Sequence, residues 1–285
     1  MEHFLIYTNP HKDEGLATTG HIGDYLRARG KRVTVRTDET GWRDGGAGDG
    51  TKDIPDGADC MVVLGGDGTM LQAAREARRL NVPMIGVNLG TLGYMTEVEP
   101  EGLDEALDRL IAGDYQRESR MMLKGTAFLP GNAAEDGWAL NDIVISRSGS
   151  LQIIKFNIYV NGRFLHDYDA DGVIITTPTG STGYNLSAGG LLVEPNAELI
   201  MVTPICPHTL NQRSIILSPE DVVEIEILPG REDRVQTVEV NFDGGHVISL
   251  GAGDRVRVVK AQKSTEFIRL SKVSFLEVLH KKMAD

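Results

Sequence analysis

Two buried-looking strands run straight into loops of small residues, and this repeated pattern constrains the fold of the chain more than any other feature. The first strand, 60–64, leads into Gly65-Gly66-Asp67-Gly68-Thr69. The second, 172–176, leads into Thr177-Pro178-Thr179-Gly180-Ser181-Thr182-Gly183-Tyr184-Asn185. Small residues allow backbone N–H groups to approach a phosphate closely, and Asp67 adds a carboxylate to the first loop. A phosphate cradle that contains a base indicates phosphoryl transfer.

The order of expected elements changes partway along the chain. Up to about residue 115, strands and helices alternate, which predicts an α/β layer with a parallel sheet. These strands are expected at 4–8, 32–36, 60–64 and 83–88, and the helices at 12–29, 69–80 and 101–112. Thr69 is expected to cap the second helix. The segment 41–57 holds six glycines and few apolar residues, and its composition predicts a loop.

The second half of the chain consists mainly of strand patterns with few helices between them, which predicts a β-sandwich or a similar fold. The strands are expected at 140–146, 152–160, 173–177, 199–204, 222–228, 235–242 and 255–260. A last strand at 267–270 and a terminal helix complete the expected elements. With 285 residues, the chain is long enough for two domains.

Composition excludes several classes of function. The formal net charge of −12 argues against a nucleic-acid-binding surface, which requires a basic face. No stretch approaches the roughly 18 apolar residues that a membrane span needs, and the amino-terminal residues lack the features of a signal peptide. We therefore expect a cytoplasmic protein. The two cysteines, Cys60 and Cys206, are expected to be small buried apolar side chains in a reducing compartment.

Known nucleotide and metal motifs are missing from the sequence. No Lys follows the last glycine of the first loop, so the loop is not a Walker A motif, and no GxGxxG occurs. The histidines show no zinc-ligand spacing, and we expect no metal site formed by the protein alone. The segment 167–172 imitates the start of an EF-hand but has Pro178 where the bidentate Glu would stand.

Three carboxylates at a period of two, Asp167, Asp169 and Asp171, lead into the second glycine loop. In an extended segment they lie on one face, suited to ribose hydroxyls, a magnesium-bound phosphate or a cationic ring. The alternative is a solvated acidic strand end. Asn141 and Asp142 open a strand at 140–146, where a polar pair is often only a turn.

Taken together, these motifs resemble the bacterial NAD kinases, which phosphorylate the adenosine ribose 2′-hydroxyl of NAD to give NADP. The resemblance is carried by the GGDGT loop, by Asn88-Leu89-Gly90-Thr91-Leu92-Gly93-Tyr94, by Asn141-Asp142 and by 171–190. It covers nearly the whole chain apart from 41–57. GGDG alone is shared with lipid kinases and phosphofructokinase-like enzymes, whereas 177–190 separates this chain from them.

The resemblance implies an α/β N-terminal domain with a parallel sheet, plus an all-β, sandwich-like C-terminal domain. The C-terminal segment is expected to return to the first domain. This places an α/β nucleotide-binding domain at 1–120 and 265–285, and a β-rich domain for NAD binding and oligomerisation at 121–264. A homodimer or homotetramer is expected, with NAD and ATP as substrates and Mg²⁺ or another divalent cation carried with ATP. Inorganic polyphosphate is left open as a donor.

The resemblance also implies roles for individual residues. Asp67 corresponds to the carboxylate that acts as general base. The phosphate-binding residues are expected to be Gly65, Gly66, Gly68 and Thr69. The NAD-binding residues are expected to be Gly68, Tyr94, Asn141, Asp142, Asp169, Asp171, Thr182, Gly183, Tyr184, Asn185 and Ser187. Asp142 replaces the usual Glu of the family, and Asp169 stands where some relatives carry Arg.

Two other functions remain open at this stage. A lipid or diacylglycerol-type kinase shares GGDGT, but it should have a basic or amphipathic membrane-facing stretch. A non-catalytic dinucleotide-binding module would bind NAD without consuming ATP. Phosphoryl donor range, NAD against NADH preference, oligomer size and feedback regulation are not encoded in recognisable motifs.

Overall fold

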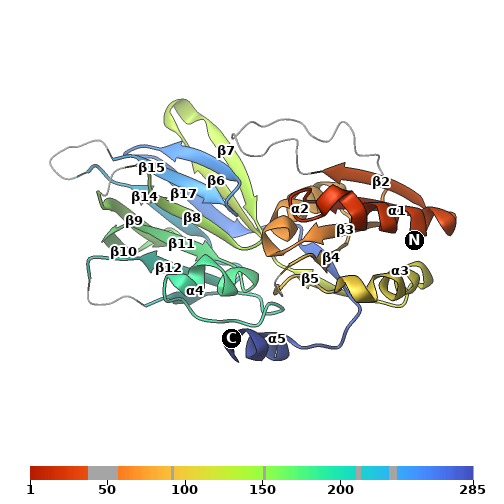
Figure 1. Cartoon of the computed structure of the whole chain (residues 1–285). Coiled ribbons are helices and arrows are strands. Elements are labelled where there is room, and N and C mark those ends of the chain that lie inside the picture. Colours follow the sequence, from red (N-terminus) through yellow and green to blue (C-terminus); the bar gives the residue numbers. More distant parts are fainter. Residues whose placement is uncertain (38–56, 91–92, 150–151, 210–212, 231–235, 285) are drawn as a thin grey trace. The chain divides into compact units, whose positions relative to one another are not determined.

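The computed structural model describes residues 1–37, 57–90, 93–149, 152–209, 213–230 and 236–284 (Figure 1). The chain forms two compact units, one of Met1–Arg120 with Thr265–Asp285 and one of Met121–Ser264. An α/β unit with a parallel sheet and an antiparallel β-sandwich confirm the expected fold class. The loop predicted at 41–57 lies, except for residue 57, outside the described residues.

A six-stranded sheet forms the centre of the first unit, in the order β2-β1-β3-β4-β18-β5. All neighbouring pairs are parallel except β18 and β5. The strands are β1 (His3–Thr8), β2 (Arg32–Thr37), β3 (Cys60–Gly65), β4 (Met84–Asn88), β5 (Gln116–Arg120) and β18 (Thr265–Arg269). Because β18 lies between β4 and β5, the end of the chain is part of this sheet, as expected.

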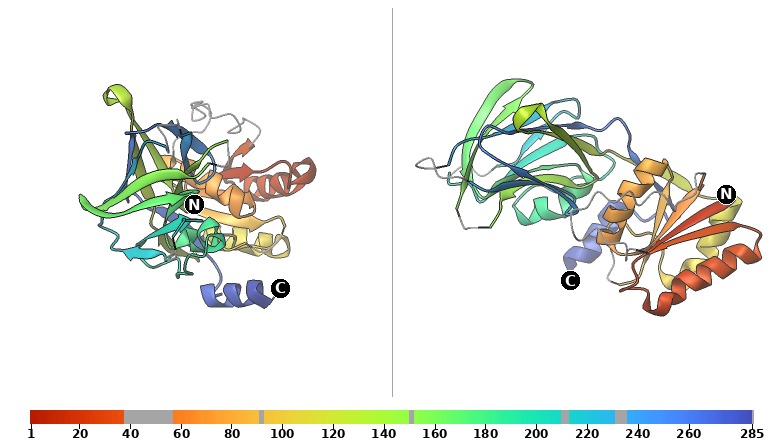
Figure 2. Two further views of the ribbon diagram at one scale, coloured as in Figure 1. Left: turned by 90° about the vertical axis from the view of Figure 1, so that its left-hand side faces the viewer. Right: turned by 90° about the horizontal axis from the view of Figure 1, so that it is seen from above.

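Helices cover both faces of this sheet (Figure 2). They are α1 (Ala17–Ala28), α2 (Asp67–Leu80) and α3 (Leu103–Ala112), and α5 (Phe275–Ala284) follows β18. Apolar residues of α1 and α3 share one core with Ile85 and Val87 of β4. Gly86, between them, points to the opposite face. A Cβ there would meet Met70 Sδ of α2 at 2.8 Å, so α2 packs on that face.

Two helix starts differ from the sequence-based expectation. The first helix does not begin near Lys12, because Gly15 and Leu16 adopt left-handed φ angles of 61° and 55°. A short 3-10 turn occupies Glu14–Leu16, and α1 begins at Ala17. The expectation that Thr69 caps α2 is wrong. Gly66 is the N-cap residue, because the helix begins immediately after β3, at Asp67.

The second unit consists of two six-stranded antiparallel sheets, ordered β10-β9-β14-β17-β6-β7 and β13-β12-β11-β8-β15-β16. The strands of the first are β6 (Leu123–Phe128), β7 (Ala134–Ala139), β9 (Ile154–Val160), β10 (Arg163–Ala170), β14 (Val223–Ile227) and β17 (Arg255–Lys260). Those of the second are β8 (Asp142–Arg147), β11 (Gly172–Thr176), β12 (Ile200–Ile205), β13 (Ile215–Leu217), β15 (Val238–Phe242) and β16 (His246–Leu250). Their inward-facing side chains form one core.

The two cysteines differ in exposure. Cys60 lies on β3, and its burial raises the pKa of the thiol to about 12. The expectation of burial is wrong for Cys206, which is exposed. Cys206 directly follows β12 and has a φ of 45°, a left-handed backbone conformation. Among the described helices, none is long and apolar enough to cross a membrane.

Candidate functional site

The first glycine loop is compressed into a direct strand-to-helix turn. Gly65 ends β3, Gly66 is the only linking residue and Asp67 begins α2. A Cβ at Gly65 would lie 2.3 Å from Thr69 Oγ1, so the backbone and the helix approach too closely for any side chain. At Gly68 the space is open, with no heavy atom within 4 Å of a Cβ. Unpaired N–H groups of the first helical turn favour an anion here.

The side chain of Asp67 is oriented by two backbone N–H groups. Tyr94 N donates to Oδ2 at 2.9 Å, and Met95 N donates to Oδ1 at 3.0 Å. Gly93 makes this docking possible, because a Cβ there would lie 2.2 Å from Asp67 Oδ1. A carboxylate oxygen has two lone pairs, so each oxygen can still accept a hydrogen bond. The loop therefore orients the carboxylate without using up its capacity as a base.

Tyr94 lies between this carboxylate and the C-terminal helix. Partial burial, and the charge of Asp67, raise the pKa of Tyr94. The ring centroid lies 6.1 Å from that of Phe275 and 4.7 Å from Lys282 Nζ. The aromatic ring expected to contact adenine is thus in contact with two residues of α5.

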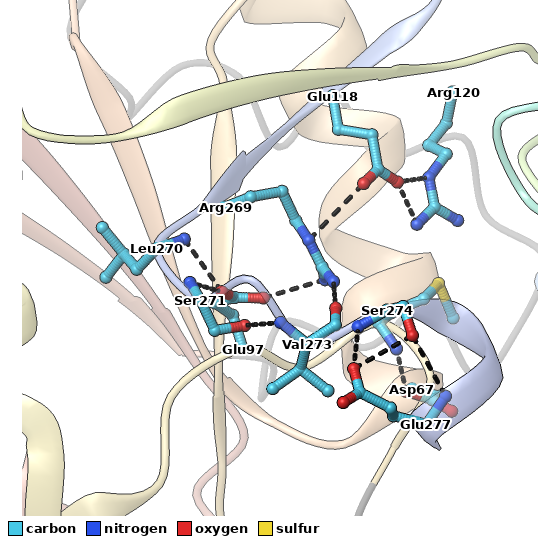
Figure 3. A network of polar contacts seen from close by, with 11 residues as sticks. Asp67, Glu97, Glu118, Arg120, Arg269, Leu270, Ser271, Val273, Ser274 and Glu277 are labelled. Carbon is cyan, nitrogen blue, oxygen red and sulfur yellow. Dashed lines mark hydrogen bonds and ion pairs between the residues drawn. The ribbon is translucent and has the colours of Figure 1, made fainter. Parts of the chain in front are cut away.

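A buried glutamate anchors the segment that leads into α5 (Figure 3). Glu97, whose side chain is 3% exposed, pairs with Arg269 Nη1 at 2.8 Å. Its Oε1 also accepts the N–H groups of Leu270 at 2.8 Å and Ser271 at 2.5 Å. This network ties the end of β18 to the loop that carries Tyr94.

The start of α5 has its own cap, also visible in Figure 3. Ser274 Oγ accepts the N–H of Glu277, and the Glu277 carboxylate accepts the N–H of Ser274 at 2.7 Å. Such a reciprocal pair satisfies two of the free donors at a helix N-terminus.

In the second unit, the Asn141-Asp142 pair and the second glycine loop form one structure. Thr177 Oγ1 donates to Leu140 O at 2.6 Å, and Thr176 Oγ1 donates to Asn141 O at 2.9 Å. A Cβ at Gly180 would lie 2.5 Å from Asn141 O. The two motifs are far apart in the sequence, but these hydrogen bonds hold them together at the end of β11.

The side chain of Asp243 also holds the Asn141-Asp142 turn in place. Its carboxylate accepts the N–H groups of Leu140, Asn141 and Asp142 at 2.6, 2.9 and 3.0 Å. Burial, together with the charge of Asp243, raises the pKa of Asp142 to about 7. Asn141 Oδ1 is buried and has no hydrogen-bond partner among the described residues. An orphaned acceptor of this kind is available to a ligand donor.

Tyr184 shares an electrostatic environment with two of the expected site carboxylates. Partial burial raises the pKa of its hydroxyl, and the charges of Cys206, Asp171 and Asp142 add to this effect. Asp171 Oδ1 accepts a hydrogen bond from Arg147 Nε at 2.8 Å. The structure therefore brings Tyr184, Asp171 and Asp142 together, with Arg147 beside them.

The three period-two carboxylates do not all share one strand. Asp167 and Asp169 lie on β10, whereas Asp171 connects β10 to β11, which belongs to the other sheet. The expectation of a single carboxylate face assumed one extended segment, and the strand ends at Ala170, one residue before Asp171. Asp169 lies 4.0 Å from Lys155 Nζ.

The remaining expected residues of the second loop differ in exposure. Asn185 is buried and uses its amide internally: Nδ2 donates to Leu191 O at 3.1 Å, and Oδ1 accepts from Thr203 Oγ1 at 2.8 Å. Thr182 and Gly183 are half-buried, while Ser187 is exposed. Asn185 thus shapes the loop from inside.

Sequence reasoning did not find Lys12, Arg147 or Asp243. A Cβ at Gly66 would lie 3.0 Å from Lys12 Nζ, and Lys12 follows the end of β1 by a few residues, which is a recognisable position. Asp243 is 103 residues from Leu140 in sequence, and no local pattern marks it. Within the described part of the chain, no three His, Cys, Asp or Glu side chains form a group that could hold a metal ion.

Comparison with known proteins matches both units to one family. The ATP-NAD kinase N-terminal domain matches residues 4–115, and the ATP-NAD kinase C-terminal domain matches residues 140–270. An NAD kinase of Lachnoclostridium phytofermentans is 44% identical over 287 residues, covering 100% of both chains. An NAD kinase of Lachnospira eligens is 41% identical over 293 residues, covering 99% of this chain and 100% of the relative.

Solved structures agree in fold. Yeast NADH kinase complexed with NADH superimposes with a TM-score of 0.80 at 23% identity, covering 100% of this chain and 88% of the other. An Archaeoglobus fulgidus NAD kinase in complex with ATP gives a TM-score of 0.75 at 23% identity and covers both chains completely.

Proposed function

This chain belongs to the ATP-NAD kinase family and is a phosphotransferase with an alcohol acceptor, and we propose a role in the reaction for each of its site residues. The reaction transfers a phosphoryl group from ATP to the adenosine ribose 2′-hydroxyl of NAD, giving NADP and ADP. The observation that carries the assignment of roles is Asp67, held by two backbone N–H groups at the start of α2.

Asp67 is the general base. The ribose 2′-oxygen forms a bond to the γ-phosphorus while the bond from that phosphorus to the bridging oxygen of ADP breaks. The proton of the 2′-hydroxyl passes to the Asp67 carboxylate as its O–H bond weakens. The backbone N–H groups of Tyr94 and Met95 donate to the Asp67 carboxylate and keep it in one orientation. Positioning is the main contribution an enzyme makes to phosphoryl transfer.

The glycine loop binds the phosphates. Gly65, Gly66 and Gly68 provide backbone that a phosphate can approach, and the N-terminus of α2 provides free N–H groups and a favourable dipole. Thr69 is 3% exposed and packs against Gly65, which supports the turn.

Mg²⁺ or another divalent cation fits this site as a partner of the nucleotide. The described residues offer no three-ligand cage, and Mg²⁺ characteristically binds substrate phosphates with one or two carboxylates. Asp67 is the carboxylate within the glycine loop itself. When bound, the cation would neutralise phosphate charge.

NAD binding is assigned mainly to the second unit. Asn141 offers a buried, unpartnered Oδ1, and Asp171 and Tyr184 lie in the same electrostatic environment. The remaining residues assigned to the dinucleotide are Asp142, Thr182, Gly183 and the exposed Ser187, with Asn185 buried beneath the loop and Asp169 on β10. In the first unit, Tyr94 contacts the adenine.

The finer properties of the enzyme are also part of the proposal. It works in the cytoplasm as a homodimer or homotetramer, and light scattering of the purified protein tests the assembly. The proposal includes inorganic polyphosphate as an alternative donor, because the loop recognises phosphates rather than a base. A lipid kinase is disfavoured, because both glycine loops match the NAD kinase family domains.

A coupled assay tests the function. Purified protein is incubated with Mg²⁺-ATP and NAD, and an NADP-specific dehydrogenase detects the product. Parallel reactions replace NAD with NADH, ATP with polyphosphate, or NAD with diacylglycerol. NADP formation with ATP is expected. If NAD raises the melting temperature but no combination yields NADP or NADPH, the chain is a binding module instead.

A further inference from the structure

The turn after β1 is held in one shape against the end of β3. Asn9 N donates to Leu64 O at 3.2 Å, one residue before the first glycine loop. Asn9 O in turn accepts the N–H groups of Lys12 at 2.9 Å and Asp13 at 3.1 Å. The backbone from which Lys12 extends is therefore tied to the strand that delivers the glycine loop.

A buried carboxylate secures the other side of the turn. Asp13 is 2% exposed and accepts the N–H groups of Thr18 and Thr19, both at 2.9 Å. It also accepts the Thr19 hydroxyl at 2.6 Å. Because its neighbour Asp13 is anchored in this way, the Lys12 backbone is held at both ends of the turn.

The side chain of Lys12 lies against the glycine loop. A Cβ at Gly66 would be 3.0 Å from Lys12 Nζ, so the ammonium lies next to the backbone of the α2 N-cap residue. Any side chain at position 66 would displace it. The ammonium therefore lies beside the glycine loop, next to the helix start that carries the unpaired N–H groups of α2.

Lys12 has no carboxylate of the described residues within 4.0 Å of Nζ, although the chain carries a net charge of −12. By contrast, Lys31, Lys124 and Lys260 each form an ion pair at 2.7 or 2.8 Å. Lys12 is also exposed, so its ammonium can meet a ligand. An ammonium next to a phosphate loop, with no counterion among the residues that the structure describes, is suited to bind the oligophosphate of the nucleotide.

We propose that Lys12 contacts the β- and γ-phosphate oxygens of ATP bound at the Gly65–Gly68 loop. This inference rests on the proposed function and extends it with a residue that acts on the phosphoryl donor. In P-loop proteins a lysine within the glycine loop neutralises the charge of these phosphates. Here the glycine loop has no lysine, and Lys12 supplies the cation from the turn after the neighbouring strand.

Kinetics of Lys12→Met test this role. We expect kcat/KM for ATP to fall by about 100-fold, in the range seen when one preorganised charge contact is lost. The Kd for NAD, measured without ATP, should remain within about twofold, since a residue that contacts only the donor leaves acceptor binding unchanged. Lys12→Arg should recover most of the activity because the positive charge remains. The matched control is Lys263→Met, which removes an exposed lysine of the second unit.

A second measurement separates this inference from the function itself. Calorimetry with inorganic tripolyphosphate, which has no ribose or base, needs no turnover. Lys12→Met should weaken this binding by about tenfold, corresponding to one charge-assisted hydrogen bond. If the unaltered protein makes no NADP, the proposed function fails, and the tripolyphosphate comparison still decides the role of Lys12. Unchanged tripolyphosphate affinity and unchanged kcat/KM for ATP in Lys12→Met would overturn the inference.

Discussion

At the scale of single residues, the position of the Asp67 carboxylate depends on the absence of a side chain at Gly93. A Cβ there would lie 2.2 Å from Asp67 Oδ1, well inside contact distance. Gly93→Ala should therefore displace the carboxylate from its two N–H donors. Because misplacement by about 1 Å can cost about 100-fold, we expect a kcat loss of that order.

Gly90→Ala is the control for this prediction, because a Cβ at Gly90 meets no heavy atom within 4 Å and the residue belongs to the same loop. Steady-state kinetics and thermal melts of both variants separate misplacement from unfolding. Equal activity in the two variants would show that Gly93 does not govern the carboxylate.

Asp142 makes stability depend on pH. Its pKa is raised from 3.8 to about 7, so the native state binds the proton more tightly than the unfolded state does. The native state is therefore favoured most below about pH 4, and the stability falls as the pH rises towards 7. Three pKa units correspond to about 4 kcal/mol of unfolding free energy.

Asp142→Asn should flatten this dependence, since the variant has no proton to lose at that position. Urea unfolding at pH 5 and pH 8 measures the difference, with the exposed Asp24→Asn as control. If the difference between the two pH values is the same in Asp142→Asn as in the unaltered protein, the raised pKa does not contribute to stability.

Single residues also show where sequence reasoning stops. Asp67 and Asn141 were identified from motifs, and the structure adds the contacts that orient them. No local sequence pattern marks Asp243, because the three N–H groups that donate to it are about one hundred residues away in sequence. Packing of this kind depends on the tertiary fold, which a one-dimensional pattern does not contain.

At the scale of elements, Glu97 holds the connection between β18 and α5. It is almost fully buried and accepts one ion pair and two backbone N–H groups. Glu97→Gln removes the closer of the two carboxylates that pair with Arg269 and leaves the 3.4 Å contact to Glu118, and removing one partner of a buried pair costs about 3 kcal/mol. We expect that loss of unfolding free energy, with faster amide exchange at the start of α5.

The exposed Glu101→Gln serves as the control for this element. Urea unfolding gives the free energies, and hydrogen exchange read by mass spectrometry gives the local protection of α5. A Glu97→Gln protein with the stability and exchange of Glu101→Gln would show that the network is not required.

The elements that the sequence predicted best are those with continuous apolar patterns. The parallel strands β1, β3 and β4 are buried along their whole length and were recognised. Strands such as β7 and β10, whose outer residues are exposed, were missed. The start of α1 was also missed, because a left-handed Leu16 is not visible in a hydrophobic pattern.

At the scale of the whole molecule, the C-terminal segment is required for the first unit. β18 is an interior strand between β4 and β5, so a chain that stops after Ser264 leaves this sheet incomplete. We expect its first unit not to fold. A chain that stops after Val273 loses Ser274 and α5, which has no buried residue, and its melting temperature should stay within about 5 °C.

Circular dichroism melts of the two truncated chains provide the measurement. A cooperative transition of the normal amplitude in the chain ending at Ser264 would mean that β18 is dispensable. A large loss of stability in the chain ending at Val273 would mean that α5 contributes to the core after all.

The central claim for the whole enzyme is that Asp67, in the first unit, is the base that accepts the 2′-hydroxyl proton of NAD. The most direct test is the single-turnover rate of NADP formation at saturating Mg²⁺-ATP and NAD, compared between the unaltered protein and Asp67→Asn. A general base contributes about 10²–10⁴-fold, so we predict a rate loss of at least about 100-fold. The affinity for NAD should change by only about threefold or less, because the base acts in the transition state. An Asp67→Asn protein that forms NADP at the unaltered rate would contradict the account.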